Sequence, residues 1–308
     1  MQKITPCLWF DNNCEEAVNF YTSLFPNSRI NSIKRYPEGM GGPMEGMGGK
    51  ILTAIFTLDD LTFQALDGGP IFKINPSISF FVNFDPSQNP NAEADLDAMW
   101  TKLAEGGVVR MELQEYPFSK RYGWIEDRFG VNWQLILTDP EGEERPRMIP
   151  SLLFTKEVAG KAEEALNFYV AIFKDGKMGQ VAKYPAGMEP EKEGTTMFAE
   201  AKLAGQWITA MDSANPGHTF SFNEAVSLSI ETQDQAETDY FWEKLSFSPE
   251  NEQCGWVKDK FGVSWQIIPK RMGELLSDPD QEKSNRVLQA MLQMKKIDIA
   301  GLEKAFNG

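Results

Sequence analysis

The hydrophobic pattern at the start of the chain predicts a strand followed directly by a helix. Residues 4–10 form a short, largely apolar run of the kind typical of a buried strand. Polar residues 11–13 then indicate a turn and a helix cap. In residues 15–25 apolar side chains recur at helical spacing, and Pro26 ends the pattern. The apolar face expected of this helix consists of Ala17, Phe20, Tyr21, Leu24 and Phe25.

The following segments repeat one order of elements, strand-helix-strand-strand-strand. The first unit is completed by strands expected at residues 29–36, 51–58 and 61–66, the last two joined by a turn at Asp59-Asp60. The same order then begins again. Its elements are a strand at residues 78–84, a helix at 92–105, and strands near 108–113, 123–127 and 133–137.

A long internal repeat indicates that the whole arrangement occurs twice. Residues 123–136, GWIEDRFGVNWQLI, return at 255–268 as GWVKDKFGVSWQII, with nine of fourteen positions identical. Residues 15–21 likewise recur at 163–169, a shift of 148 residues. Such a match is evidence of tandem duplication. Each copy is expected to hold two βαβββ modules, and the fold class is α+β.

Two domains and an extension follow from the repeat. We expect domain 1 at residues 1–139, a polar, proline-bounded linker at 140–147, domain 2 at 148–270 and a C-terminal extension at 271–308. The second copy is shorter in one place. Leu245 to Trp256 spans 11 positions, where Leu103 to Trp124 spans 21, so one strand should be reduced or lost.

The extension has no counterpart in the first copy, and its apolar residues lie at helical spacing. A second, shorter helix is expected at residues 299–306. We interpret the extension as a helical strap on the domains or on a partner subunit. The residues that carry the helical pattern are Val287, Leu288, Met291, Leu292 and Met294.

Composition and charge narrow the classes of function. The net charge of −15 and the pI near 4.7 argue against nucleic-acid and anionic-membrane surfaces, which require a positive field. Three cysteines without metal-ligand spacing argue against a disulfide framework and favour a reducing compartment. The N-terminal residues lack the apolar region of a signal peptide. A cytoplasmic location is therefore expected.

The repeated motifs resemble those of the vicinal oxygen chelate superfamily, which includes glyoxalases, bleomycin resistance proteins and dioxygenases. Within it, the chain is similar to the PhnB-like branch, whose members are often labelled 3-demethylubiquinone-9 3-methyltransferase-like. The resemblance implies two tandem glyoxalase-like domains, each with a curled mixed sheet that forms a cup. It rests on Ala17, Phe20, Tyr21, Trp124, Asp127, Phe129, Gly130, Trp133 and Gln134, on their equivalents in the second copy, and on the tail residues 291–305.

Enzymes of this superfamily usually hold a divalent metal in the cup through His or Gln and Glu, and this chain departs from that pattern. Its one histidine is His218, and Gln134 and Gln266 stand where the last strand normally places a Glu ligand. A neutral amide without such companions holds zinc or nickel weakly. We therefore expect no tightly held metal and no other cofactor. Weak metal capture by glutamine and carboxylates is the alternative.

The methyltransferase label meets a physical objection. The glycine-rich segment 39–49 lies between two expected strands, whereas a glycine-rich nucleotide cradle joins a strand to a helix. Its counterpart at 187–194 is acidic and would repel phosphate. A flexible loop or pocket lid is the better interpretation.

The candidate ligand-binding residues are glutamines and tryptophans on strands that should line the cups. A buried amide needs hydrogen-bond partners, so Gln134 and Gln266 bind either a ligand or neighbouring backbone. For the tryptophans, core packing is the alternative to ligand contact. The set is Gln134, Gln266, Trp124, Trp256, Gln64, Trp9 and Trp207.

Other polar residues are expected to serve the scaffold. Asp67 and Asp212 each end a strand, Asp127 and Asp259 precede a tight turn, and capping explains all four. Cys7 and Cys14 have no histidine at hand to activate them, Cys254 has no metal-ligand spacing, and His218 has no counterpart in the first copy. The catalytic residues are therefore unknown.

Three functions fit these residues. The first is a protein that binds or sequesters a small molecule in an aromatic-lined cup without metal. The second is a metal-assisted isomerase, lyase or dioxygenase-like enzyme acting on a small oxygenated substrate, so enzymatic activity stays open. The third is a structural module whose pockets have closed. A small molecule is the expected partner, and homodimer formation through the sheets or the tail is a further expectation.

Overall fold

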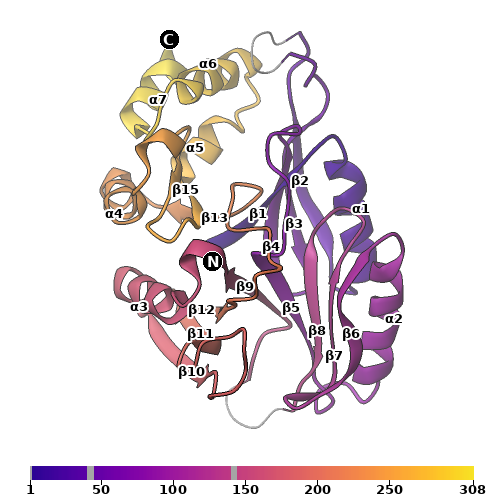
Figure 1. Cartoon of the computed structure of the whole chain (residues 1–308). Coiled ribbons are helices and arrows are strands. Elements are labelled where there is room, and N and C mark those ends of the chain that lie inside the picture. Colours follow the sequence, from indigo (N-terminus) through magenta and orange to yellow (C-terminus); the bar gives the residue numbers. More distant parts are fainter. Residues whose placement is uncertain (1, 40–44, 140–143) are drawn as a thin grey trace. The chain divides into compact units, whose positions relative to one another are not determined.

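A computed structural model describes residues 2–39, 45–139 and 144–308 (Figure 1). Two compact units divide the chain: residues 6–226 form the larger one, and residues 227–308 with the N-terminal residues up to Thr5 form the smaller. Parts of two expected segments, the glycine-rich loop (residues 40–44) and the linker (residues 140–143), lie outside the described residues. The domain boundaries expected at residues 139 and 148 stay a prediction.

The first module has the predicted order of elements. It comprises β1 (Ile4–Phe10), α1 (Cys14–Leu24), β2 (Arg29–Arg35), β3 (Ile51–Leu58) and β4 (Leu61–Asp67). β1 and β4 pair in parallel, β4 and β3 antiparallel, and β3 and β2 antiparallel. α1 packs on β3 and β4 and buries Ala17 and Tyr21, two residues of its predicted apolar face.

An eight-stranded sheet in the larger unit combines strands from both copies of the repeat. Its order is β10-β11-β12-β9-β5-β8-β7-β6. The second module of copy one supplies β5 (Ile78–Phe84), α2 (Ala92–Ala104), β6 (Val108–Tyr116), β7 (Ser119–Glu126) and β8 (Asn132–Leu137). The first module of copy two supplies β9 (Met148–Phe154), α3 (Ala162–Ile172), β10 (Lys177–Lys183), β11 (Thr196–Leu203) and β12 (Gln206–Asp212).

The two halves of this sheet meet at β5 and β9. These strands pair antiparallel, with Ser79 opposite Ser151 and Phe81 opposite Ile149. Within each half, the first and last strands of the module pair in parallel. α2 packs on β5, β7 and β8, and α3 packs on β9 to β12, so the helices cover one face. This sheet therefore forms between the two copies, a point that the sequence left open.

The smaller unit contains the last module and the extension. Its strands β13 (Val226–Thr232), β15 (Ser264–Pro269) and β14 (Trp256–Lys258) lie side by side, and α4 (Gln235–Leu245) precedes β14. Between Leu245 and Trp256, all of it described, a short 3-10 helix, Pro249–Asn251, replaces a strand. The predicted loss of one strand in the second copy is thus confirmed.

Helices α5 (Lys270–Leu275), α6 (Gln281–Leu292) and α7 (Ile299–Asn307) form the extension. α6 and α7 confirm the helical pattern of the tail, whereas the short α5 was not predicted. Their shared core consists of Met272, Leu275, Val287, Ile297 and Leu302. Within the described part of the chain, no helix has the length and apolarity needed to cross a membrane.

The repeated Asp-x-Phe-Gly motif forms a buried hydrogen-bond centre in the larger unit. One carboxylate oxygen of Asp127 accepts from the backbone N–H groups of Phe129 (2.8 Å) and Val131 (3.1 Å), as a turn cap should. The other accepts from the Tyr21 hydroxyl and from Trp133 Nε1, both at 2.8 Å. Burial raises the pKa of Asp127 to about 6, and these donors act in the opposite direction. The motif therefore ties α1 to the β7–β8 turn as well as capping it.

Replacing Asp127 by asparagine should destabilise the protein by about 2–4 kcal/mol, because its amide nitrogen would face two hydrogen-bond donors in either orientation. The midpoint of urea unfolding, followed by circular dichroism, measures the loss. Asp139→Asn makes the same chemical change at an exposed position and should cost less than about 0.5 kcal/mol. Equal midpoints for the two variants would contradict the assigned role of Asp127.

Candidate functional site

The candidate site is the face of the eight-stranded sheet that the helices leave uncovered, called here the cup face. Strand alternation places Phe80 and Trp133 beneath the helices, both fully buried, and Phe81 and Gln134 on the cup face. Phe81 lies between Gln134 and Ile149 in the register of β8, β5 and β9. Trp133 therefore belongs to the core, as predicted for the residue preceding a cup-facing glutamine.

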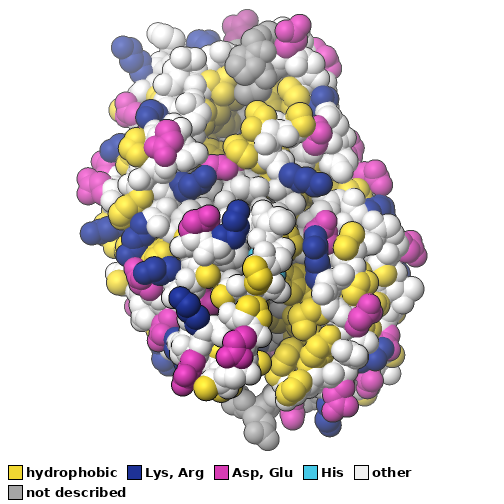
Figure 2. Space-filling model, viewed as in Figure 1, with side chains coloured by type: hydrophobic (Ala, Val, Ile, Leu, Met, Phe, Trp, Pro, Cys, Tyr) yellow, Lys and Arg dark blue, Asp and Glu magenta, His cyan; other side chains and the backbone are white. Residues whose placement is uncertain are grey.

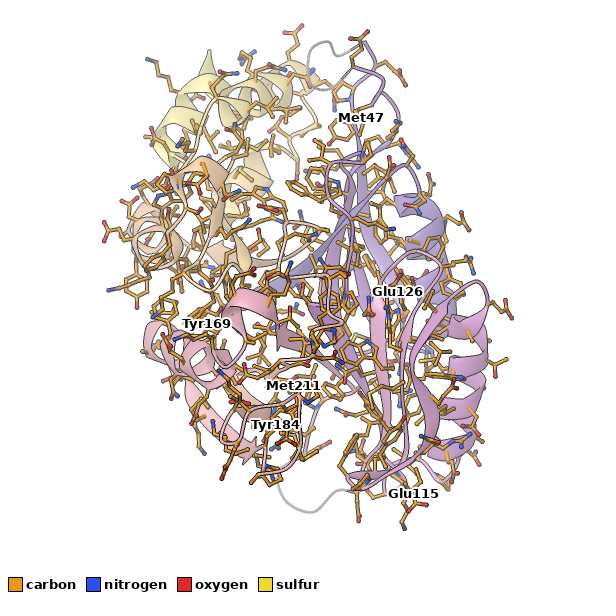
Figure 3. The ribbon with its side chains drawn as sticks, in the orientation of Figure 1. Met47, Glu115, Glu126, Tyr169, Tyr184 and Met211 are labelled. Carbon is orange, nitrogen blue, oxygen red and sulfur yellow. The ribbon has the colours of Figure 1, made fainter. Side chains whose placement is uncertain are left out.

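An aromatic cluster covers the cup face. Its buried members come from four strands, and six partly buried side chains pack against them. Hydrophobic side chains gather beside a hollow over β5, β8 and β7 in Figure 2. Figure 3 labels Met211 on β12 and Glu126 on β7, which belong to the two halves of this sheet. The cluster consists of Phe81, Tyr122, Ile149 and Trp207, with Met111, Tyr116, Trp124, Ile136, Phe198 and Met211 around them.

Gln134 is completely buried, and both ends of its amide are bound to side chains. Its Oε1 accepts a hydrogen bond from the Tyr122 hydroxyl at 2.6 Å, and its Nε2 donates one to Ser79 Oγ at 2.8 Å. Burial raises the pKa of Tyr122, so the phenol stays protonated and donates. The sequence predicted a ligand or backbone partner for Gln134; the structure shows two side-chain partners, and the ligand contact stays a prediction.

A row of polar side chains crosses the floor of the cup face. Its members are register partners on five neighbouring strands. Running from β8 to β11, they are Asn132, Ser79, Ser151, Thr209 and Glu200, which are 0%, 1%, 0%, 1% and 5% exposed. Sequence reasoning missed this row. The available signal was a serine inside each of the apolar runs of β5 and β9.

Ser151 differs from its neighbours in the row because its hydroxyl oxygen has no hydrogen-bond partner among the described residues. Ser79 accepts from Gln134, and Asn132 Oδ1 accepts from Trp124 Nε1 at 3.1 Å. A buried hydroxyl without a partner costs about 1–3 kcal/mol, so proteins rarely keep one. Ser151 is therefore the polar group on the cup face that is available to a ligand.

Trp207 and Trp124 lie at opposite ends of the cluster. The Arg145 guanidinium stacks 3.9 Å from the centre of the Trp207 ring and donates two hydrogen bonds to Glu200, at 2.6 and 3.1 Å. The charge of Glu200 at one end of the polar row is thus compensated. Trp124 is the register partner of Gln134. The fold brings three predicted residues, Gln134, Trp124 and Trp207, to one surface, whereas Arg145 was not predicted.

Trp9 and Gln64 lie elsewhere, on the sheet that contains β1 and β4. Gln64 is the register partner of Cys7, and Trp9 is two residues further along β1. Trp9 Nε1 donates to the Gly69 carbonyl at 2.8 Å, and its ring contacts Phe72 edge-on. These two predicted residues are therefore not brought to the sheet of Gln134.

Gln266 and Trp256 repeat part of the geometry in the smaller unit. They are register partners on β15 and β14, like Gln134 and Trp124 on β8 and β7. Gln266 Nε2 donates to Ser227 Oγ at 3.0 Å, the counterpart of the bond from Gln134 to Ser79. The duplication thus preserved a glutamine–serine pair between the parallel strands of the second module in each copy.

The donor set of the cup face does not fit a tightly bound divalent metal. The buried amide, two serines and a threonine at its centre are neutral, and the oxygen of Gln134 already accepts from Tyr122. Among the described residues, no group of three or more His, Cys, Asp and Glu side chains has a metal-binding arrangement. All three cysteines are described and none forms a disulfide; burial raises the pKa of the Cys14 thiol.

Comparisons with known proteins agree with this architecture. The family model described as 3-demethylubiquinone-9 3-methyltransferase matches residues 2–136 and again 146–268. The chain is 42% identical to a PhnB protein from Bacillus cereus, over 44% of this chain and 100% of that one, with a TM-score of 0.40. No curated protein matches it.

A glyoxalase I mutant from Zea mays is similar over 87% of this chain and 92% of its own, with 11% identity and a TM-score of 0.53. At that identity the likeness shows the fold alone. The double match of the family model confirms the predicted resemblance to the 3-demethylubiquinone-9 3-methyltransferase-like branch and the tandem duplication, and the likeness to glyoxalase I confirms the α+β glyoxalase-like fold.

Two serines that face each other across β5 and β9 should respond in opposite ways to substitution. Ser79→Ala removes a partner of Gln134 and should lower the free energy of unfolding by about 1–2 kcal/mol. Ser151→Ala removes an unpartnered hydroxyl, so stability should stay unchanged or rise by up to about 1 kcal/mol. Both changes delete one oxygen, so each variant is the control for the other. Equal losses would show that the Ser151 hydroxyl has a partner after all.

Proposed function

Since the chain belongs to the family described as 3-demethylubiquinone-9 3-methyltransferase and shares its fold with glyoxalase I, we propose that it binds a small, ring-bearing organic molecule on the cup face. The observation that carries this proposal is the unpartnered Ser151 hydroxyl, which lies on β9 two residues from Ile149 of the aromatic cluster. Aromatic walls with a few convergent polar groups are characteristic of small-molecule sites.

The surroundings of Ser151 favour a neutral ligand that carries oxygen. Its hydroxyl can donate to a carbonyl or hydroxyl oxygen and can also accept. The neighbouring polar groups are neutral, and Glu200 is compensated by Arg145. Rings such as Tyr116, Trp124 and Phe198 stand at the partly exposed edge of the cluster and can stack on a flat ligand. The ligand class is therefore a small aromatic compound with a carbonyl or hydroxyl group.

Binding without a resident metal suits this floor better than metal-assisted catalysis. The neutral donor set offers no strong ligand for a divalent cation. The methyltransferase in the family description does not by itself give these residues a role in methyl transfer. One observation favours a second candidate, a structural module closed by its own side chains. Phe81 and Trp207 are only 8% and 9% exposed, so a ligand must displace edge residues to reach Ser151.

A fragment screen separates the two candidates. We expect ring-bearing fragments with a carbonyl or hydroxyl group, such as catechol and 4-hydroxyacetophenone, to bind the full chain in saturation-transfer NMR and to change its tryptophan fluorescence. Ser151→Ala should weaken binding about tenfold, the value of one hydrogen bond of about 1.4 kcal/mol. Ser87→Ala, an exposed serine, is the control and should bind like the natural sequence.

The same titrations identify the alternatives. We expect EDTA to leave fragment binding unchanged. Loss of binding after addition of EDTA would favour the metal-assisted enzyme. If no fragment of the set bound, the structural module would be the better interpretation. If Ser151→Ala bound every fragment as tightly as the natural sequence, the ligand would not bind at Ser151 and the proposed site would be wrong.

A further inference from the structure

A cavity of about 380 Å³ lies in the larger unit beside the ends of β9 and β12. It is separate from the cup-face cluster, since none of the cluster residues lines it. Its lining comes from the β9–α3 connection, the loop before β11 and the loop after β12. The residues used below are Lys156, Gly160, Lys192, Asp212 and His218.

This cavity is a feature of the second copy. β9 ends at Phe154, and α3 begins eight residues later, at Ala162. In copy one, β1 ends at Phe10, and α1 begins only four residues later, at Cys14. In copy one the indole of Trp9 packs directly against the turn after β4. A Cβ added to Gly68 in that turn would lie only 2.0 Å from the indole. The longer connection and a different turn therefore open space that copy one fills with a ring.

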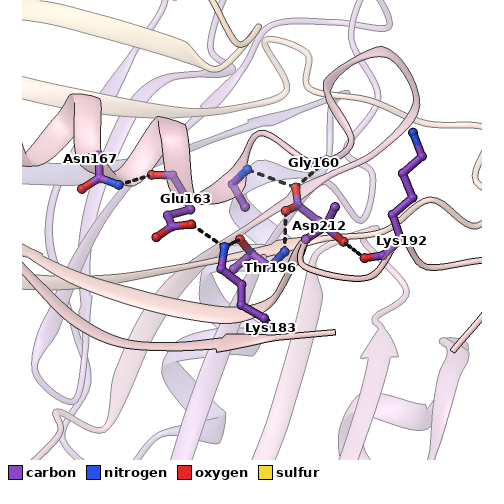
Figure 4. A network of polar contacts seen from close by, with 9 residues as sticks. Gly160, Glu163, Asn167, Lys183, Lys192, Thr196 and Asp212 are labelled. Atoms are coloured by element: carbon purple, nitrogen blue, oxygen red, sulfur yellow. Dashed lines mark hydrogen bonds and ion pairs between the residues drawn. The ribbon is translucent and has the colours of Figure 1, made fainter. Parts of the chain in front are cut away.

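Asp212 forms the back of the cavity, and its carboxylate is fully used. One oxygen accepts from the backbone N–H groups of Gly160 (2.8 Å) and Ala162 (3.0 Å), and the other from that of Thr196 (2.9 Å), as Figure 4 shows in part. These bonds disperse its negative charge and also occupy amides at the start of α3. A ligand of this cavity must therefore be recognised by other groups.

Two such groups are the ammonium ions of Lys156 and Lys192. Neither forms an ion pair with any described residue, whereas their neighbours Lys161 and Lys183 are paired with glutamates on α3. Figure 4 shows the Lys192 side chain extending away from Asp212.

His218 contributes a third nitrogen, which becomes a hydrogen-bond donor when the ring is protonated. Its Nε2 lies 3.0 Å from Ser213 Oγ, and Ser213 Oγ donates its single proton to Glu191 at 2.6 Å. Nε2 must therefore be the donor in its bond to Ser213, which leaves Nδ1 as the site of protonation. Burial lowers the pKa of His218. An anion in the cavity would favour the protonated ring.

We propose that this cavity binds a small oxyanion, a metabolite with a carboxylate or phosphate group, through Lys156 and Lys192 with His218 at its edge. Lysine ammonium groups act as point charges for both anions. Glu191, in the acidic segment 187–194, also lies beside the cavity, but its carboxylate accepts from Ser213 Oγ and the Ala214 N–H, both at 2.6 Å. The carboxylates of Glu191 and Asp212 are thus both hydrogen-bonded, whereas the two ammonium groups have no ion-pair partner among the described residues. A volume of this size admits a molecule of several heavy atoms in place of about ten waters.

The chain offers a specific reporter for this site, because His218 is its one histidine. In tag-free full-length protein labelled with ¹⁵N-histidine, we expect inorganic phosphate or citrate to shift the His218 ring signals saturably at constant ionic strength. Sodium chloride at equal ionic strength should not. Saturation should raise the pKa of His218 by about half a pH unit or more, because a nearby negative charge favours the protonated ring.

Lys156→Ala/Lys192→Ala should weaken this binding at least about tenfold, since both direct charges are removed. Both side chains are exposed, so the fold should be unaffected. Lys174→Ala/Lys177→Ala makes the same charge change at exposed positions outside the cavity and should bind normally.

Response to citrate alone would assign the site to carboxylates, and response to phosphate alone would assign it to phosphates. A shift no larger than that with chloride, or equal weakening in both double variants, would overturn the proposal.

Discussion

The antiparallel pairing of β5 with β9 is the constraint on which the cup face depends. It joins the second module of one copy to the first module of the next, and it sets Ser79 beside Ser151. Because side chains alternate along a strand, a shift by one residue would turn Phe81 toward the helices and bring Phe80 to the cup. The polar row, the aromatic cluster and the position of Gln134 all follow from this single register.

Buried polar groups give the scaffold its specificity. Asp127 joins α1 to the turn between β7 and β8, and Gln134 joins Tyr122 to Ser79 across three strands. Each of these groups is satisfied by named partners, and such networks favour one arrangement over its alternatives. Ser151 is the exception in the row, which is why the proposed ligand site is placed there.

Duplication distributes the two proposed sites differently. The cup face is built from repeated motifs, and the glutamine–serine pair recurs at Gln266 and Ser227. The oxyanion cavity lies where the copies diverged, around a longer connection and the unrepeated His218. His218 has no counterpart in the first copy, so a comparison of the repeated motifs does not identify it as a site residue. Divergence between copies is also informative, because the second copy was free to open a space that Trp9 fills in the first.

The sequence by itself determined most of the helices and strands, the tandem duplication, the lost strand and the burial of Trp133, because periodicity, turn residues and repeated motifs act between residues close in the chain. It also identified Gln134, Trp124 and Trp207 as candidates. Only the tertiary structure decided that these residues share a face drawn from both copies, that Trp9 and Gln64 lie on another sheet, and that Arg145 stacks on Trp207. Strand partners and register depend on contacts between residues far apart in sequence, and no local pattern encodes which hydroxyl in a buried row lacks a partner.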